Sequence, residues 1–273
     1  METNISEIQG LSSIAESPPA FELEDVSVCF AGANRRQVLN GINLRVPRGE
    51  FIAIVGKSGC GKTTILNLLV GLLTPTSGAV KINGKVAIES RHHVGYMVAR
   101  DCLFPWRRVL QNVTLPLEVR GVNSTERNEL ARKALEKVAL GQCLELFPRQ
   151  LSHGMRQRVA LARTWALNPD ILLMDEPFAA LDALTRLDLE REFLGLVSER
   201  KSTVLLVTHD LAEALAMADR VLVLSEGAIT LEQKVPFERP RDPESIMTDT
   251  RFPALFKRLR DALHSREIRS STA

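Results

Sequence analysis

Apolar and polar positions alternate along two segments near the start of the chain, which predicts two half-buried β-strands. The first covers residues 21–30 and the second residues 38–46. A Pro-Arg-Gly turn follows at 47–49. We therefore expect a small β region to precede the rest of the fold.

Four later segments are continuously apolar and short, which is typical of strands buried on both faces of a parallel sheet. Helical patterns separate them. The sequence therefore predicts an α/β fold with a largely parallel sheet. The four segments are residues 51–55, 171–174, 203–207 and 221–224.

The stretch from about residue 100 to 166 is rich in helix formers and predicts an inserted helical subdomain. Within it, we expect Ser124 to cap a helix over residues 125–138. After residue 231 the chain becomes polar, and a final amphipathic helix follows. Its apolar face would carry Leu255, Phe256, Leu259 and Leu263. The expected division is a flexible tail at 1–20, a main domain at 21–235 and a C-terminal helical extension at 236–273.

Composition narrows the class of protein. The 273 residues are 45% hydrophobic and 25% charged, which excludes a disordered or fibrous chain. A net charge of +2 gives no electrostatic reason to expect a nucleic-acid partner. The four cysteines form no CxxC pair, the first residues do not resemble a secretory signal, and no run reaches the roughly 18 apolar residues of a membrane span. We expect a soluble protein with free thiols that can still attach to a membrane protein.

The strongest local signal is the octapeptide GKSGCGKT at residues 56–63, which follows a predicted buried strand and opens a helix. Glycines let successive backbone N–H groups point at anionic oxygens, and the helix N-terminus favours negative charge. Lys62 supplies a charge to the β- and γ-phosphates of a nucleotide, and the Thr63 hydroxyl is a ligand for Mg²⁺. The predicted nucleotide-binding residues here are Gly56, Lys57, Ser58, Gly59, Cys60, Gly61, Lys62, Thr63 and Thr64.

Two acids end the buried run at 171–174, at the sheet edge where α/β proteins bind ligands. Asp175 is expected to hold Mg²⁺ directly or through water. Glu176 is expected to act as general base, or to orient water, for attack on the γ-phosphate. His209 directly follows another buried run and is expected to bond the γ-phosphate or that water. The alternatives are a solvated strand end for the two acids and a capping or surface role for His209.

The segment LSHGMRQR at 151–158 resembles the signature motif of ABC-type ATPases, usually LSGGQ. Ala180, Leu181 and Asp182 resemble the D-loop of that family, and His209 resembles its switch histidine. The resemblance covers roughly residues 21–235. It implies a P-loop NTPase (RecA-like) core with a mostly parallel sheet, an N-terminal antiparallel β subdomain and an inserted helical subdomain.

The resemblance also implies a mechanism that needs two ATPase subunits, paired head to tail with ATP between them. One supplies the P-loop, Asp175 and Glu176, and the other supplies Ser152 and Gly154 at the signature helix. The partner is either a second copy or a different ATPase. Phe30 is expected to stack on adenine, with a core phenylalanine as the alternative.

Residues 94–113 resemble the ATPase subunits of nitrate, sulfonate and taurine importers. This implies a membrane permease that docks a coupling helix near Phe104, Pro105 and Trp106, with local packing as the alternative for Trp106. A periplasmic or lipoprotein solute-binding protein would be an indirect partner. The location implied is peripheral, at the cytoplasmic face of the inner membrane. Rival interpretations are a regulatory or weakly active nucleotide-binding subunit and a soluble ABC-type ATPase.

Two positions depart from the family pattern. Ala99 stands where the family has a glutamine that ligates Mg²⁺, and His153 stands where the signature has glycine. His153 would either crowd the partner's nucleotide or donate a hydrogen bond to it. Because Glu176 and His209 remain, we expect slow-to-moderate hydrolysis. The C-terminal helix either packs on its own domain or presents basic residues to an anionic membrane, namely Arg251, Lys257, Arg258, Arg260, Arg266 and Arg269.

Overall fold

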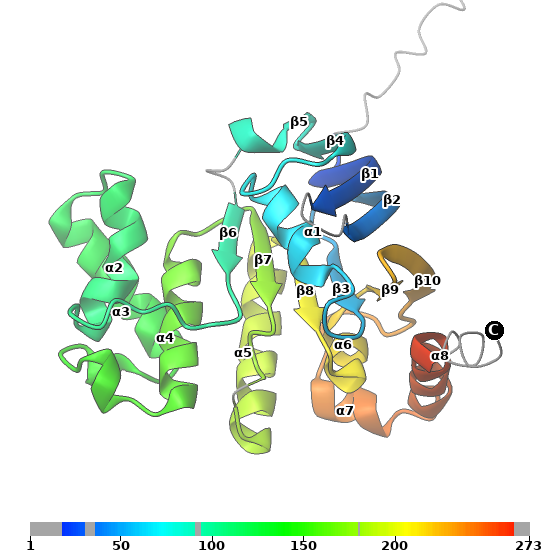
Figure 1. Ribbon diagram of the computed structural model, residues 1–273. Coiled ribbons are helices and arrows are strands. Elements are labelled where there is room, and N and C mark those ends of the chain that lie inside the picture. Colours follow the sequence, from blue (N-terminus) through cyan, green and yellow to red (C-terminus); the bar gives the residue numbers. More distant parts are fainter. Residues whose placement is uncertain (1–17, 31–35, 91–93, 180, 265–273) are drawn as a thin grey trace, which may run out of the picture.

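The computed structural model describes residues 18–30, 36–90, 94–179 and 181–264. Most of the expected tail and the last nine residues, including Arg266 and Arg269, lie outside this part of the chain. Two sheets form the framework: a six-stranded sheet in the order β10-β9-β3-β8-β7-β6 and a four-stranded sheet in the order β2-β1-β4-β5 (Figure 1). Strands β3, β6, β7, β8 and β9 pair in parallel, and β10 runs antiparallel to β9 at one edge.

The strands have the following bounds: β1 Phe21–Phe30, β2 Arg36–Val46, β3 Phe51–Val55, β4 Ser77–Ile82, β5 Lys85–Val86, β6 Val94–Met97, β7 Ile171–Asp175, β8 Thr203–Thr208, β9 Arg220–Ser225 and β10 Ala228–Lys234. The helices are α1 Lys62–Leu69, α2 Val109–Val119, α3 Ser124–Lys137, α4 His153–Ala166, α5 Ala183–Arg200, α6 Leu211–Met217, α7 Pro243–Thr248 and α8 Phe252–His264. Short 3₁₀ turns lie at Ala87–Glu89, Gly141–Cys143 and Pro148–Gln150. All six predicted strands are confirmed, and four of them extend one or two residues further.

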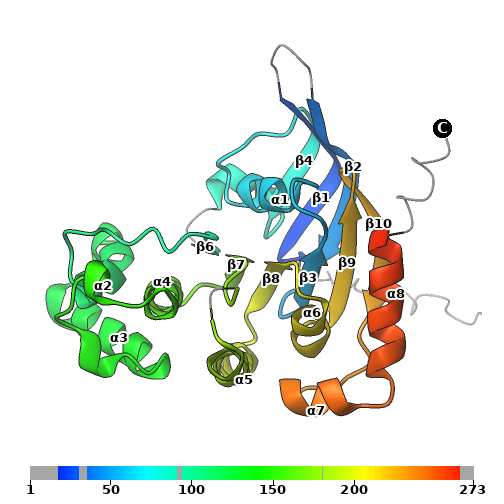
Figure 2. The same cartoon turned by 60° about the horizontal axis from the view of Figure 1, so that its bottom comes forward.

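The central strands are buried on both faces because their apolar residues feed two separate cores. In β3, Phe51, Ala53 and Val55 belong to one core, while Ile52 and Ile54 belong to the other. The first core contains residues of α4, α5 and α6, and the second contains residues of α1, β1 and β2. Figure 2 shows α1 on one side of the six-stranded sheet and α5 with α6 on the other. This sandwich explains why these strands have no polar face.

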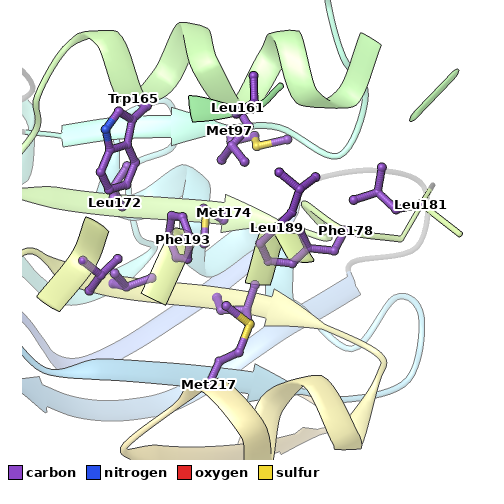
Figure 3. Packing of buried hydrophobic residues seen from close by; sticks show 14 of the residues in the cluster. Met97, Leu161, Trp165, Leu172, Met174, Phe178, Leu181, Leu189, Phe193 and Met217 are labelled. Carbon is purple, nitrogen blue, oxygen red and sulfur yellow. The ribbon is translucent and has the colours of Figure 1, made fainter. Parts of the chain in front are cut away.

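Helices α2, α3 and α4 pack on one another at one end of the molecule (Figure 1). Phe193 of α5 ties them to the sheet. Its ring makes edge contacts with Trp165 of α4 at 5.6 Å, Phe51 of β3 at 6.1 Å and Phe178 at 6.0 Å between centroids. Figure 3 shows Trp165, Phe178 and Phe193 within a continuous apolar cluster between α4, α5 and the sheet. The helical region is therefore anchored through aromatic packing.

The cap of α3 corrects one sequence expectation. Ser124 is the first helical residue, and Asn123 is the N-cap. The Asn123 side-chain oxygen accepts from the backbone N–H of Glu126 at 3.0 Å, and its amide donates to the Glu126 carboxylate at 2.9 Å. If Ser124 were the N-cap and the helix began at residue 125, Asn123 and Glu126 could not form this pair of hydrogen bonds.

The C-terminal helix α8 packs against β9, β10 and α6. Leu259 is fully buried, and Leu255, Phe256 and Leu263 lie against the same core, so the predicted apolar face is confirmed. Lys257, Arg258 and Arg260 are exposed. Among the helices of the described residues, none is both long and apolar enough to cross a membrane. The proposed domain boundaries stay predictions.

Candidate functional site

The loop at 56–61 runs from the carboxyl end of β3 into α1, at the edge of the parallel sheet. Gly61 adopts φ +111° directly before the helix, a conformation that favours glycine. A Cβ at Gly61 would lie 2.6 Å from Leu39, and a Cβ at Gly56 would lie 2.4 Å from the Leu224 carbonyl oxygen. Gly61 therefore lies too close to β2, and Gly56 too close to β9, to carry a side chain. These two close approaches fix the curl of the loop.

Lys62 brings a cation into this loop. Its side chain is only 8% exposed, and Nζ donates to the carbonyl oxygens of Gly56 at 2.6 Å and Lys57 at 3.1 Å. Ser58 and Gly59 are exposed at the tip, while Cys60 is buried beneath it. The arrangement gathers an ammonium group and a helix N-terminus at one point, which suits a polyphosphate.

Thr63 and Asp175 meet across the sheet edge. The Thr63 hydroxyl donates to Oδ2 of Asp175 at 2.7 Å. Burial raises the pKa of the Asp175 carboxyl, and the hydrogen bond from Thr63 opposes that rise. A hydroxyl and one carboxylate are hard oxygen donors of the kind that hold Mg²⁺ together with phosphate oxygens. The donor set therefore fits the expected ion.

Glu176 follows β7 in a strained conformation. Its φ is +50°, and its backbone N–H donates to the Val207 carbonyl oxygen at 2.8 Å. Oε2 of Glu176 lies 3.3 Å from Nδ1 of His209. The carboxylate and the imidazole are therefore close enough to interact. Glu176, His209 and the phosphate loop thus all follow the carboxyl ends of parallel strands, at the same edge of the sheet.

A cavity of about 420 Å³ lies beside the loop. Phe30, at the end of β1, is 47% exposed, which sets it apart from the core phenylalanines and favours a stacking role over core packing. The cavity is lined by Arg36, Gln37, Val38, Lys57, Ser58, Gly59, Cys60, Leu224, Ser225, Glu226, Gly227 and Leu263. Its size and polar lining suit a nucleoside.

Ser152 and Gly154 stand at the start of α4. The Ser152 Oγ accepts from the Met155 backbone N–H at 3.2 Å and so caps the helix. Ser152 is exposed and Gly154 half-buried. Within the same chain, Gln157 of α4 donates from Nε2 to the Glu176 carbonyl oxygen at 3.5 Å. The start of α4 therefore lies at the surface, while Gln157, about one turn later, contacts the segment that carries Glu176. Of the expected D-loop residues, Ala180 lies outside the described part of the chain.

The segment before α2 is held by Asn112. This side chain is fully buried, accepts from the Phe104 backbone N–H at 2.8 Å and donates to the carbonyl oxygens of Phe104, Arg107 and Arg108. Trp106 is 70% exposed and packs its ring edge-on at 5.3 Å from Phe104. The sequence signal for this role of Asn112 is an amide side chain within a mostly apolar helix.

A groove of about 450 Å³ lies between β6, α2 and α4. Trp106 is not among its lining residues, so the groove and the exposed tryptophan are separate features. The lining residues are Tyr96, Leu115, Pro116, Val119, Arg120, Arg163, Thr164 and Leu167. Ala99 is exposed in the loop that follows β6.

Sequence reasoning missed a pair of buried acids behind His209. Burial raises the pKa of Glu213 to about 8 and that of Glu190 to about 7. Glu213 Oε2 accepts from the Thr208 hydroxyl at 2.8 Å. Among the described residues, the other oxygen of Glu213 and Oε2 of Glu190 have no hydrogen-bond partner. Burial depends on how α5 and α6 pack, which no local pattern reveals.

Arg186 connects the same region to the segment after Glu176. Its guanidinium donates to Oδ2 of Asp210 at 3.2 Å and to the Leu181 carbonyl oxygen at 3.3 Å. Asp210 caps α6, and Asp182 caps α5. The loops that carry His209 and Asp182 are therefore held to each other.

Comparisons with known proteins agree with this geometry. The family profile described as ABC transporter matches residues 39–179. An uncharacterized ABC transporter ATP-binding protein of Methanocaldococcus jannaschii is 47% identical over 228 residues, which cover 82% of this chain and 85% of that protein. An aliphatic sulfonates import ATP-binding protein of Burkholderia lata is 43% identical over 232 residues, covering 84% and 70%. A nitrate import ATP-binding protein of Synechococcus elongatus is 39% identical over 233 residues, covering 84% and 85%.

Solved structures give the same result. A dimeric ATP-binding cassette in a post-hydrolysis state, bound to ADP and Pi, superposes with a TM-score of 0.75 and 33% identity, covering 80% of this chain and 100% of that chain. The P-loop and the buried strand that ends in two acids both lie within the residues that the family profile matches. The chain belongs to the ABC transporter family, as an ATP-binding subunit that hydrolyses ATP.

Proposed function

We propose that this chain powers an importer of a small anionic solute of the nitrate, sulfonate or bicarbonate class, through a separate membrane permease. The support is the shared chemistry of the solutes in the relatives' names. These are aliphatic sulfonates and nitrate for the two relatives described above, and bicarbonate for a transport ATP-binding protein of Synechocystis sp. that is 38% identical over 250 residues. The chain would act as a peripheral subunit at the cytoplasmic face of the membrane. A periplasmic or lipoprotein solute-binding protein would deliver the solute to the permease.

Two copies of the chain would pair head to tail around ATP. The observation that carries this proposal is the exposed start of α4, whose first turn is capped by Ser152 and is followed by the half-buried Gly154. A helix N-terminus favours phosphate. The nucleotide in one subunit would therefore be closed in by the signature helix of the other.

Within each site, the roles follow from position. Lys62 and the amides of the P-loop would bind the phosphates, and Phe30 would stack on the base. Thr63 and Asp175 would hold a Mg²⁺ ion, which neutralises phosphate charge when bound. Glu176 would take the proton of the attacking water as the bond between the γ-phosphorus and its bridging oxygen breaks, and His209 would orient Glu176 and the phosphate.

The permease would dock on the groove lined by Tyr96, Pro116 and Leu167, with the exposed Trp106 as a further anchor. This groove is mostly apolar and borders both the sheet and the helical region, so an amphipathic helix suits it. The competing interpretation is a weakly active regulatory subunit, and Ala99 favours it because a methyl group cannot ligate a metal.

One experiment tests the assembly. The purified chain is incubated with magnesium-ATP, and phosphate release and sedimentation are measured together. We expect slow hydrolysis and an ATP-dependent dimer. No phosphate release at any protein concentration would favour the regulatory interpretation, and hydrolysis by a strict monomer would contradict head-to-tail pairing.

A second experiment addresses Ala99. If alanine in place of the family's glutamine limits the rate of ATP hydrolysis, Ala99→Gln raises phosphate release several-fold. Unchanged turnover would mean that this position is dispensable here.

A further inference from the structure

The turn that carries His209 is held from behind by a threonine and a glutamate. Thr208 is the last residue of β8, and its hydroxyl oxygen accepts from the Asp210 backbone N–H at 3.0 Å. The same hydroxyl donates to Oε2 of Glu213 in α6 at 2.8 Å. One hydroxyl thus ties the residue before His209 to two residues after it, and Glu213 is one end of that link.

Asp210 connects the same turn to α5. Its Oδ1 accepts from the Glu213 backbone N–H at 3.3 Å and caps α6, and its Oδ2 accepts from Arg186 of α5 at 3.2 Å. Arg186 also donates to the Leu181 carbonyl oxygen at 3.3 Å. The guanidinium therefore holds the turn after β8 to the segment that precedes α5.

This network contains buried polar atoms that no partner satisfies. Glu213 and Glu190 are only 4% and 1% exposed. Among the residues that the structure describes, Oε1 of Glu213, Oε2 of Glu190 and Nε of Arg186 are buried without a hydrogen-bond partner. A buried carboxylate with an unpaired oxygen is costly, whereas a neutral carboxyl in the same place costs much less. The cluster therefore favours a proton on its acids.

The charges around Glu213 point the same way. Glu190 and Arg186 act on it from α5, and Asp210 acts on it from the cap of its own helix. Strands β3 and β8, which also contact α6, have no ionisable side chain, and the ionisable side chains of α8 are exposed. The acid of α7 and the arginine of β9 form ion pairs with other partners. An ionised Glu213 would therefore join two other acids and one cation.

That single cation is already engaged. Burial raises the pKa of Glu213 to about 8, so the carboxyl is largely neutral at pH 7. One of its oxygens then accepts from Thr208 while Arg186 stays on Asp210. An ionised Glu213 would draw Arg186 away from Asp210, because a buried charge needs a partner. The turn would then lose the bond that ties it to α5.

We propose that Glu213, as a neutral acid, is a positioning residue for His209: through the Thr208 hydroxyl it fixes the turn that sets Nδ1 of the imidazole 3.3 Å from Oε2 of Glu176. The inference rests on the roles proposed above for His209 and Glu176. Because Glu213 acts through another residue, its loss should lower kcat and leave KM within about twofold, since the P-loop is untouched. Ionisation of Glu213 should lower kcat in the same way.

The first test follows phosphate release by the full chain at saturating magnesium-ATP from pH 6 to pH 9.5. The kcat of the original chain should fall several-fold as the pH passes about 8. Glu213→Gln keeps an acceptor for Thr208 and cannot ionise, so its kcat should match the original at pH 7 within about twofold and lack that fall. Glu238→Gln, on an exposed side chain, is the matched control and should keep the fall. The same fall in Glu213→Gln, or none in the original chain, would overturn the proposal.

The second test breaks the link at its other end. Thr208→Val keeps the shape of the side chain and removes the hydroxyl, so kcat at pH 7 should fall about tenfold with KM within about twofold. Adding Glu213→Leu should change kcat little further, because both substitutions remove the same bond. Thr208→Ser restores the hydroxyl and should recover kcat. Additive losses in the double variant, or a Thr208→Ser variant as slow as Thr208→Val, would overturn the proposal.

A readout that does not depend on hydrolysis separates this inference from the proposed roles. The imidazole signals of the nucleotide-free chain are recorded by NMR, and His209→Gln identifies the signal of His209. Glu213→Leu should shift that signal, and Glu213→Gln should leave it in place. An unmoved signal in Glu213→Leu would mean that Glu213 does not position the ring. If the signal shifts as expected but His209→Gln hydrolyses ATP at the original rate, the positioning stands and the proposed role of His209 is wrong.

Discussion

The P-loop and the start of α4 are both helix N-termini suited to an anion, but they are held in different ways. The P-loop is fixed by its main chain: Gly56 and Gly61 approach neighbouring strands too closely for a Cβ, and Lys62 is buried against loop carbonyls. The start of α4 is exposed and is held by side chains, namely Ser152, Arg156 and Asp101. Under the proposed pairing, the first would bind phosphate within one chain, and the second would supply half of a site in the partner subunit. We therefore expect changes at the catalytic edge to act on chemistry and changes at α4 to act on pairing.

The largest expected effect is at the catalytic edge. Glu176→Gln keeps the shape of the side chain and removes the general base, so hydrolysis should fall more than about 100-fold. ATP binding should stay within about threefold, because the P-loop is untouched. Phosphate release measures the fall in hydrolysis, and equilibrium nucleotide binding measures the retained affinity for ATP. Hydrolysis above a tenth of the original rate would remove Glu176 from the catalytic role.

A matched pair of helix caps sharpens the comparison at α4. Ser152→Ala and Asn123→Ala each remove an oxygen that accepts from a first-turn N–H, at 3.2 and 3.0 Å. Each should lower the free energy of unfolding by about 1 kcal/mol. Only Ser152→Ala should also weaken ATP-dependent pairing, by about tenfold. Equal pairing of the two variants, measured by sedimentation, would mean that Ser152 is only a cap.

The buried acids give a pH effect of intermediate size. Because burial raises the pKa of Glu213 to about 8, the folded chain keeps a proton that the unfolded chain releases near pH 4.5. The contribution of the Glu213 carboxyl to the free energy of unfolding is therefore complete at low pH, and it is lost as the pH rises from about 4.5 through 8. Glu213→Gln mimics the protonated side chain, so its stability relative to the original chain should increase across this window.

Denaturant unfolding at pH 5, 6.5 and 8 measures this difference. The control is Glu238→Gln, the same chemical change on an exposed side chain, which should show no trend with pH. A flat difference for Glu213→Gln as well would mean that Glu213 is ionised in the folded chain.

The smallest expected effect on stability is at Trp106. The side chain is 70% exposed and packs mainly on Phe104, so Trp106→Ala should change the free energy of unfolding by no more than about 0.5 kcal/mol. Its association with the permease, measured by co-purification, should weaken several-fold. A loss of several kcal/mol instead would mark Trp106 as a structural residue.

Sequence patterns predicted the central strands because β3, β7, β8 and β9 each contain a short run of four or five apolar residues. The same rule missed β6, whose four residues include Gly95 and Tyr96, and β10, which alternates on an exposed edge. The chemistry of Gly56–Thr63 was predictable because a phosphate cradle is local in sequence. The assigned roles of these site residues stay predictions.

The contacts around α4 could not be predicted in this way. Arg156 and Asp101 are 55 residues apart, and their pairing depends on how the loop after β6 lies against α4. The burial of Glu190 and Glu213 likewise arises only when α5 and α6 pack together. These features are products of tertiary structure, and a single sequence carries no periodic signal for them.

Phe193 has a consequence for motion within the subunit. One ring touches the central strand, the helix that bears the signature and the segment just beyond Glu176. Edge-to-face contacts are a favoured arrangement of aromatic rings and add stability beyond the area they bury. Any motion that takes α4 away from the sheet must therefore break these ring contacts, which makes Phe193 a link between the helical region and the segment that follows Glu176.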